Sequence, residues 1–296
     1  MHTPNRFRRE LRAAALLGLL GGLLLVVGQL LGGMTGLIIA GGVAVVVNVG
    51  MYFGSDRLAL RAMRAKPLDE RAYPSVVSAV RELAVAHEIP MPRLYLADTG
   101  LPNAFASGRN PEHAVVCVTT GLLARLDARE LRGVLSHELS HVANRDLLVT
   151  SIAGTMATAL VMIANMAQWS LLFGGGDDED SPNIATMLAM LIVAPLAATA
   201  LRMGLSRSRE YAADQTGARR SGDPLALASA LRVIADESTK VHEPMPQRAA
   251  GISALMISSP WRSGDRLERW MSSHPPTAER IDRLEQMAQR SLSSTR

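Results

Sequence analysis

A segment with the side chains needed for hydrolysis runs from His137 to His141 and reads His-Glu-Leu-Ser-His. It falls in an expected helix that begins near Asp127, with Glu130 three residues later as the second half of a capping box. Residues four apart share one helix face, so both imidazoles can bind one zinc ion. Glu138 can then accept a proton from a zinc-bound water as that water attacks a peptide carbonyl. Two solvated histidines flanking a surface glutamate are the alternative.

A third ligand is available in the segment from Ser206 to Asp214, where Glu210 and Asp214 stand four residues apart on another expected helix. Glu210 could complete a site of two histidines and one glutamate, with water in the open position. Asp214 suits a different role, in which it accepts a hydrogen bond from a ligating histidine and determines its tautomer. An ordinary solvated helix face is the alternative for this pair.

The composition indicates a membrane protein and argues against several other classes. Apolar residues make up 48% of the 296 residues, although aromatic residues make up only 4%. The net charge of +4 comes without a basic stripe interleaved with aromatic residues, so we expect no nucleic-acid partner. Cys117 is the single cysteine, which excludes an intrachain disulfide and a cysteine metal cluster, and fits a reducing compartment.

Uncharged runs predict four membrane spans arranged in two hairpins. No charged residue occurs between Arg12 and Asp56, and one helix of that length would extend about twice the thickness of a bilayer core. We therefore expect two spans, at about 12–31 and 35–54, with a reversal near Gly32–Gly36. A cleaved signal peptide is the alternative for the first run.

The second hairpin is expected at about 147–173 and 183–202, with acidic residues between the two runs. Pro195 would kink its second helix, and buried helices of a soluble domain are the alternative. Lys and Arg near the ends of the spans place both termini and the polar middle segment in the cytoplasm. The expected organisation is a first hairpin at 1–55, a first catalytic part at 56–146, the second hairpin at 147–205 and a second catalytic part at 206–296.

Both expected ligand helices adjoin the second hairpin, because His141 comes shortly before it and Glu210 shortly after it. The zinc site would then lie just above the cytoplasmic membrane surface. This location favours substrates that are themselves associated with the membrane.

Four separated motifs resemble the HtpX family of bacterial membrane zinc metalloproteases: Pro102–Arg109, His137–Asp146, Ser206–Asp214 and His274–Ile281. The resemblance implies that His137, His141 and Glu210 bind one zinc ion per subunit and that Glu138 is the base. It also implies an endopeptidase of the bacterial inner membrane that cleaves misfolded or damaged membrane proteins in quality control and stress response, with its catalytic domain in the cytosol. Ser107 stands where many members of the family have threonine.

The expected fold is an α-helical membrane protein with a mainly helical, α+β, zincin-like catalytic domain that contains a small β-sheet. Apolar residues at helical spacing predict a core-packing helix near 74–87. Another helix is expected to start at Asp223, and a final one near Pro276. Short strands are expected around 93–97, 103–107 and 114–119, and a loop at about 241–264.

The two outer motifs have structural and functional interpretations. An edge strand could hold an extended substrate by its backbone, and an ordinary hairpin edge is the alternative. His274 could donate to the developing oxyanion or cap the structure, and Arg280 could pair with a carboxylate near the site. Surface positions are expected for His87, His113 and His242, and Cys117 should pack as a small apolar residue. The edge strand that could hold an extended substrate consists of Asn103, Ala104, Phe105, Ala106 and Ser107.

These features together predict a zinc endopeptidase that acts on membrane proteins or unfolded polypeptides in the lipid bilayer, without a covalent intermediate. A dedicated processing protease for membrane-associated peptides is one alternative. A non-catalytic membrane scaffold that keeps a structural metal is another, but a structural site would have no need of Glu138 as a base.

Overall fold

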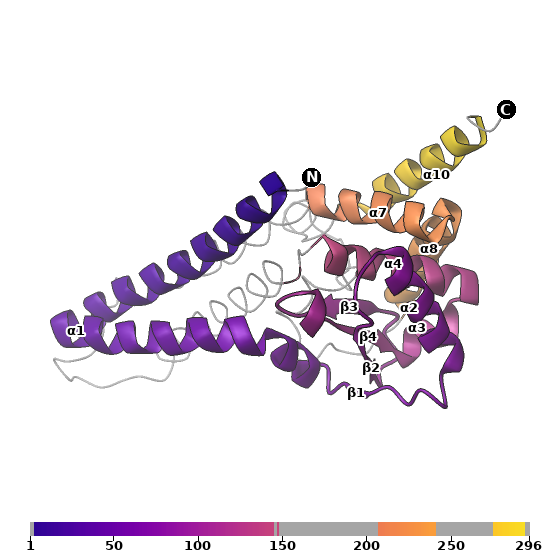
Figure 1. Cartoon of the computed structure of the whole chain (residues 1–296). Coiled ribbons are helices and arrows are strands. Elements are labelled where there is room, and N and C mark those ends of the chain that lie inside the picture. The colour runs from indigo at the N-terminus through magenta and orange to yellow at the C-terminus, as the bar shows by residue number, and fades with distance from the viewer. Residues whose placement is uncertain (1–2, 145–146, 148–206, 241–274, 294–296) are drawn as a thin grey trace.

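The computed structural model describes residues 3–144, 147, 207–240 and 275–293 (Figure 1). Several expectations fall outside these residues: His242, His274, the loop at 241–264 and, apart from residue 147, the second hairpin. The remaining expectations can be compared directly with the structure.

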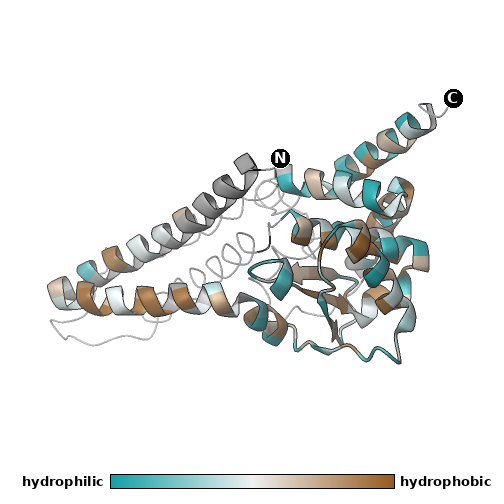
Figure 2. Cartoon of the chain, in the orientation of Figure 1, coloured by the Kyte–Doolittle hydropathy of each residue, from teal (hydrophilic) through white to brown (hydrophobic). Residues whose placement is uncertain are grey.

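Helix α1 (Thr3–Ala62) folds back on itself. Gly33 has a φ angle of +54°, a left-handed conformation that glycine adopts without steric cost. Figure 1 shows two arms that extend away from the rest of the chain, and Figure 2 shows apolar residues along the arm that leads toward the sheet. Within the described residues, no helix combines the length and the apolar character needed to cross a membrane.

The sheet contains four strands in the order β1-β2-β4-β3. β1 pairs antiparallel with β2, β2 pairs parallel with β4, and β3 pairs antiparallel with β4 along the edge of this sheet. The strands expected at 93–97, 103–107 and 114–119 are confirmed, although the last two each begin one residue later. The bounds are Lys66–Pro67 for β1, Arg93–Ala97 for β2, Ala104–Ser107 for β3 and Val115–Thr119 for β4.

The two faces of the sheet are covered by different helices because strand side chains alternate in direction. Ala104, Ala106 and Val116 belong to the main core, which also contains residues of α2 (Pro74–Ala86) and α4 (Ala128–Ala143). Phe105, Val115 and Cys117 instead pack with Ala59 and Leu60 at the end of α1. Strand β3 therefore lies between α4 and the end of α1.

Helix α4 begins with the expected capping box, which is confirmed. The Glu130 amide donates to Asp127 Oδ1 at 2.7 Å, and the Asp127 amide donates to Glu130 Oε2 at 3.1 Å. The helix expected to start at Asp223 is also confirmed, since the Ala226 amide donates to Asp223 Oδ1 at 3.0 Å. The other helices are the 3-10 turn Pro111–His113, α3 (Thr120–Arg125), α7 (Arg207–Ser221), α8 (Pro224–Lys240) and α10 (Thr277–Ser293).

Two glycines allow helices to approach α4 closely. A Cβ atom on Gly133 would lie 2.8 Å from the backbone nitrogen of Leu227 in α8. A Cβ atom on Gly217 of α7 would lie 2.9 Å from the backbone nitrogen of His137. Real Cβ atoms essentially never come this close to backbone, so glycine at both positions permits this packing. The described chain is thus mainly helical with a small mixed sheet, and α4 lies between α7, α8 and the sheet.

Candidate metal centre and catalytic site

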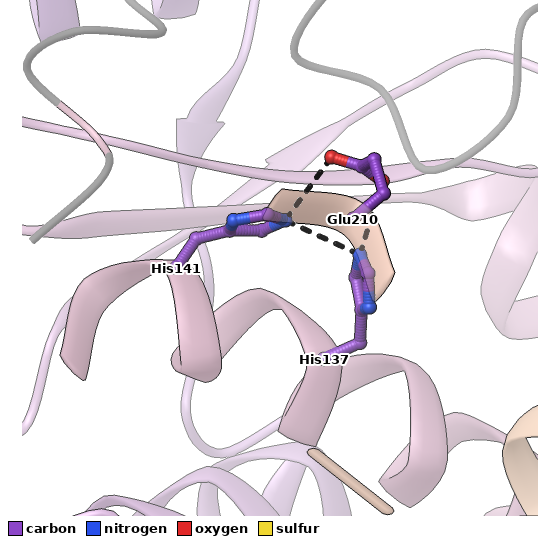
Figure 3. A group of neighbouring side chains, drawn as sticks. All are labelled: His137, His141 and Glu210. Carbon is purple, nitrogen blue, oxygen red and sulfur yellow. Dashed lines mark hydrogen bonds and ion pairs between the residues drawn. The ribbon is translucent and has the colours of Figure 1, made fainter. Parts of the chain in front are cut away.

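Side chains from two helices converge at one point (Figure 3). His137 and His141 project from α4, and Glu210 comes from the first turn of α7. Their ligand atoms all lie within 4.8 Å of one another. The two histidine Nε2 atoms are 3.3 Å apart, and Glu210 oxygens lie 3.7 Å from His137 Nε2 and 3.6 Å from His141 Nε2.

These separations fit a single zinc ion. Nitrogen and oxygen ligands at about 2.1 Å from zinc, in tetrahedral geometry, are roughly 3.4 Å from each other. The distances of 3.3, 3.6 and 3.7 Å are close to that value. Two imidazoles and a carboxylate also leave a fourth position open, as catalytic zinc sites do. The donor set therefore fits a catalytic zinc site in both chemistry and spacing.

Asp214 lies one helical turn after Glu210 and contacts the far side of His137. Its Oδ1 atom is 2.9 Å from His137 Nδ1. A proton on Nδ1 would leave the lone pair of Nε2 directed toward Glu210 and His141. Burial favours neutral Asp214, but the charge of Arg280 and hydrogen bonds from His137 and Arg280 outweigh it and lower the pKa of Asp214 to about 2. Asp214 is therefore ionised at neutral pH, and burial lowers the pKa of His137.

Arg280 reaches the site from α10 and is only 1% exposed. Its Nε and Nη2 atoms donate to Oδ2 and Oδ1 of Asp214 at 2.8 and 2.7 Å. Its Nη1 atom is 3.7 Å from Glu210 Oε2. Burial disfavours the charged guanidinium, but its carboxylate neighbours, Asp214 foremost, raise the pKa of Arg280 above its usual value. A buried arginine needs such partners, and here the bidentate pair also orients Asp214.

Glu138 points toward the edge strand β3. The Ala106 amide donates to its Oε2 atom at 2.9 Å. Burial raises the pKa of Glu138 to about 8. A carboxylate whose pKa lies near neutrality can both accept and return a proton, as a general base must.

The backbone of β3 alternates between the sheet and its outer edge. The Thr119 amide donates to the Asn103 carbonyl at 3.0 Å, so the backbone of Asn103 faces β4. The backbones of Ala104 and Ala106 then face outward. The Ala104 amide is bound by Asn103 Oδ1 at 2.9 Å, and the Ala106 amide by Glu138. Residues 103–107 thus lie at an edge beside the candidate base, and the backbones of Phe105 and Ser107 face β4.

Two expectations about lone side chains are confirmed and one is wrong. His113 is exposed, and Cys117 is buried, which raises the pKa of its thiol to about 12. His87, expected at the surface, is only 4% exposed. It is buried because the end of α2 packs near α4 and α7, where His87 Nε2 lies 3.0 Å from Ser136 Oγ.

Sequence reasoning also missed Ser136 and Gly217, which connect α4 and α7 beside the candidate ligands. Ser136 Oγ donates to the Gly217 carbonyl at 2.8 Å. Gly217 could have been noticed as a small residue one turn beyond Asp214, on the face of α7 that carries both carboxylates. No local pattern marks His87, whose partner is 49 residues away.

Comparisons with known proteins identify the family to which this chain is similar. The family model for peptidase family M48 matches residues 55–288. The chain is 46% identical to the Protease HtpX homolog of Sulfurihydrogenibium sp. over 290 residues, which cover 95% of this chain and 97% of the relative. It is also 46% identical to the Protease HtpX homolog of Paenarthrobacter aurescens over 296 residues, with coverage of 99% and 100%.

Among solved structures, Ste24p of S. mikatae is similar to this chain with a TM-score of 0.52 and 18% sequence identity. The match covers 95% of this chain, which spans 66% of that chain. At this level of identity the similarity concerns the fold alone.

Proposed function

Because the chain belongs to peptidase family M48, a family of zinc-dependent metalloproteases, we propose that it hydrolyses peptide bonds at the site formed by α4 and α7. In this proposal His137, His141 and Glu210 hold one zinc ion, and Glu138 is the general base. The observation that carries the proposal is the convergence of the three ligand atoms within 4.8 Å, at separations that suit tetrahedral zinc.

In this proposal, the residues around the metal site transfer protons and orient the reacting groups. Zinc, when bound, would act as a Lewis acid toward water and the peptide carbonyl. Glu138 accepts the proton from the attacking water and returns it to the leaving amine. Its hydrogen bond from the Ala106 amide, at 2.9 Å, holds the carboxylate between the ligand helix and the edge strand. The reaction needs no covalent intermediate.

In this proposal, Asp214 and Arg280 orient the ligands without binding the metal themselves. Asp214 keeps the proton of His137 on Nδ1, so that Nε2 is available as a ligand. Arg280 holds Asp214 through two hydrogen bonds and restricts its rotation. Both residues are positioning residues. A role for His274 at the oxyanion or in capping the structure stays a prediction.

Strand β3 is the proposed substrate-binding edge. The amides of Ala104 and Ala106 donate to Asn103 Oδ1 and Glu138 Oε2, so an extended peptide would pair with this edge mainly through the outward carbonyl groups of these residues. The Ala106 amide also contacts Glu138, so a peptide on this edge would lie beside the base. Substrate selection would then depend mainly on an extended backbone, which unfolded polypeptides offer.

We further propose that the substrates are misfolded or damaged membrane proteins and that the enzyme is embedded in the bacterial inner membrane. The uncharged run from Arg12 to Asp56 supports the membrane location. So do the apolar side chains that α1 exposes, such as Val46, which is 72% exposed. Lys and Arg flank the expected spans at the ends that join the termini and the catalytic domain. Because such positively charged flanks stay in the cytoplasm, we place both termini and the catalytic domain there.

Substitution of Glu138 by Gln tests the mechanism in the full-length protein. We expect zinc content to be retained and cleavage of an unfolded polypeptide to fall by a factor of about 10²–10⁴, because general-base catalysis is lost. Glu112→Gln, at an exposed position, is the matched control and should change neither quantity. Hydrolysis at the wild-type rate by the Glu138 variant would overturn the mechanism.

The substrate proposal needs a separate measurement. The wild-type enzyme, reconstituted in vesicles, should cleave a misfolded membrane protein in the same bilayer faster than an unfolded soluble polypeptide at equal concentration. Equal rates for both would contradict the preference for membrane substrates and leave the catalytic proposal intact.

A further inference from the structure

A buried chain of hydrogen bonds joins three elements behind the candidate metal site. His87 directly follows α2, and its Nε2 atom is 3.0 Å from Ser136 Oγ of α4. Ser136 Oγ in turn donates to the carbonyl oxygen of Gly217 in α7 at 2.8 Å. A serine hydroxyl has only one proton, and Ser136 gives it to Gly217. Ser136 therefore accepts from His87, whose Nε2 carries the proton.

These hydrogen bonds lie directly beside the proposed ligands. Ser136 immediately precedes His137, and Gly217 comes seven residues after Glu210, on the same face of α7. The backbone of Gly217 approaches α4 so closely that a Cβ atom would lie 2.9 Å from the His137 nitrogen. Any change in the separation of the two helices here would move Glu210 relative to His137.

Ser140, one turn further along α4, makes a different kind of hydrogen bond from Ser136. Ser140 Oγ donates to the Ser136 carbonyl of its own helix at 2.8 Å, a common arrangement for serine inside helices. Ser136 instead donates across to α7. Because His87 donates to its oxygen, the Ser136 hydroxyl is directed toward Gly217.

His87 is suited to be a constant donor. Burial, together with the charge of Arg220, lowers the pKa of His87 to about 4. The imidazole is therefore neutral at physiological pH, and its single proton is available for Ser136. The hydrogen-bond geometry of His87, Ser136 and Gly217 carries the inference, and a neutral ring is consistent with it.

We propose that His87, Ser136 and Gly217 form a clamp that sets the separation of α4 and α7, and thereby the position of Glu210 relative to His137 and His141. His87 is a positioning residue in this clamp, because it acts on the ligands through Ser136. The inference rests on the proposed zinc site and adds a residue to it from outside the ligand helices.

The test uses the full-length protein in detergent and measures three quantities. These are the zinc dissociation constant by competition with a chelator, kcat and KM on an unfolded polypeptide, and the thermal midpoint of the zinc-free protein. The variants are His87→Ala, His87→Gln, Ser136→Ala and the double variant His87→Ala/Ser136→Ala. Ser140→Ala is the matched control, since its hydroxyl bonds within α4.

We expect His87→Ala and Ser136→Ala each to weaken zinc affinity about 10–100-fold, as loss of supporting partners does in other metal sites. The kcat should fall while KM changes little. Gln keeps a neutral N–H donor, so His87→Gln should recover most of the affinity. The double variant should be no worse than the poorer single variant, because both remove the same connection. Ser140→Ala should leave zinc affinity unchanged.

Loss of thermal stability with an unchanged zinc dissociation constant would overturn the clamp, since His87 would then only contribute to packing. Additive losses in the double variant would also overturn it. If His87→Ala does not fold, Ser136→Ala decides the question by the same measurements. A His137→Ala variant that binds zinc as tightly as the wild type would instead refute the proposed zinc site, which distinguishes the two failures.

Discussion

Helices α4 and α1 arrange their side chains in opposite ways. In α4, every residue from Gly133 to Ser140 is buried, and each polar side chain in that stretch has a hydrogen-bond partner or contacts a carboxylate. In α1, large apolar side chains are exposed instead, including Ile38 at 69% and Val46 at 72%. Polar groups are thus enclosed in one helix, while apolar groups are left uncovered in the other.

This difference indicates which surroundings each helix requires. Burial of ionisable groups in α4 is costly unless specific partners compensate for it, and α7, α10 and β3 supply those partners. Exposure of apolar groups on α1 is costly in water and favourable in a lipid bilayer. We infer that α4 depends on precise protein contacts and that α1 depends on its medium. Substitutions in each region should therefore have different consequences.

The largest effect should follow removal of a ligand from the α4–α7 site. Glu210→Ala should raise the zinc dissociation constant by more than about 100-fold, beyond the range typical of residues that only support ligands. Chelator competition measures this constant. The control is Gln215→Ala, an exposed position on the same helix. Wild-type affinity in Glu210→Ala would remove Glu210 from the ligand set.

The assignment of α1 to a membrane can be tested with two valines of similar exposure. Val46 in α1 is 72% exposed and Val85 in α2 is 76% exposed. If α1 lies in a bilayer, Val46→Lys should disfavour insertion by about 2.5–3.5 kcal/mol. Val85→Lys should change stability by less than about 0.5 kcal/mol. The fraction of protein integrated into membranes measures the first effect, and equal behaviour of the two variants would contradict the assignment of α1.

Loss of a supporting partner should have a smaller effect than loss of a ligand. Asp214→Asn cannot hold the His137 proton in the same way, so we expect zinc affinity to fall about 10–100-fold. The same chelator competition applies, again with Gln215→Ala as the control. A loss as large as that of Glu210→Ala would mean that Asp214 itself binds the metal.

The pH dependence of stability should distinguish the enclosed charges of the site. The pKa of Asp214 is lowered from 3.8 to about 2, so its stabilising contribution is present above pH 3.8 and is lost as the pH falls toward 2. This contribution is about 2 kcal/mol. The thermal midpoints of zinc-free wild type and Asp214→Asn should therefore converge between about pH 5 and pH 2. A constant difference over that range would show that Asp214 is not held in this ionised state.

The smallest effect should come from the start of α4. Asp127→Ala removes the acceptor for the Glu130 amide and should destabilise the protein by about 1 kcal/mol, with zinc affinity unchanged. Thermal unfolding measures the change. Asp282→Ala, at an exposed position of α10, should cost less than about 0.5 kcal/mol. A large loss of zinc affinity in Asp127→Ala would mean that the cap also positions the site.

Much of the local structure could be predicted because its causes are local. Val115–Val118 favours a strand through β-branched residues, and Asp127 with Glu130 specifies the start of α4. His137 and His141, like Glu210 and Asp214, share a helix face by their spacing alone. The contacts of His87 and Arg280 could not be assigned in this way. His87 meets Ser136 49 residues away, and Arg280 meets Asp214 66 residues away.

Sequence alone was enough to select the two pairs of candidate site residues, because helical periodicity depends only on neighbouring residues. How the pairs meet was decided by packing between helices. The backbone of Gly217 lets α7 approach His137, Ser136 connects the two helices, and Arg280 from α10 holds Asp214 in place. These contacts arise between segments distant in the chain, and helix packing depends on the shapes of both surfaces at once. The tertiary structure therefore determined the spacing of the ligands, and with it the fit to zinc.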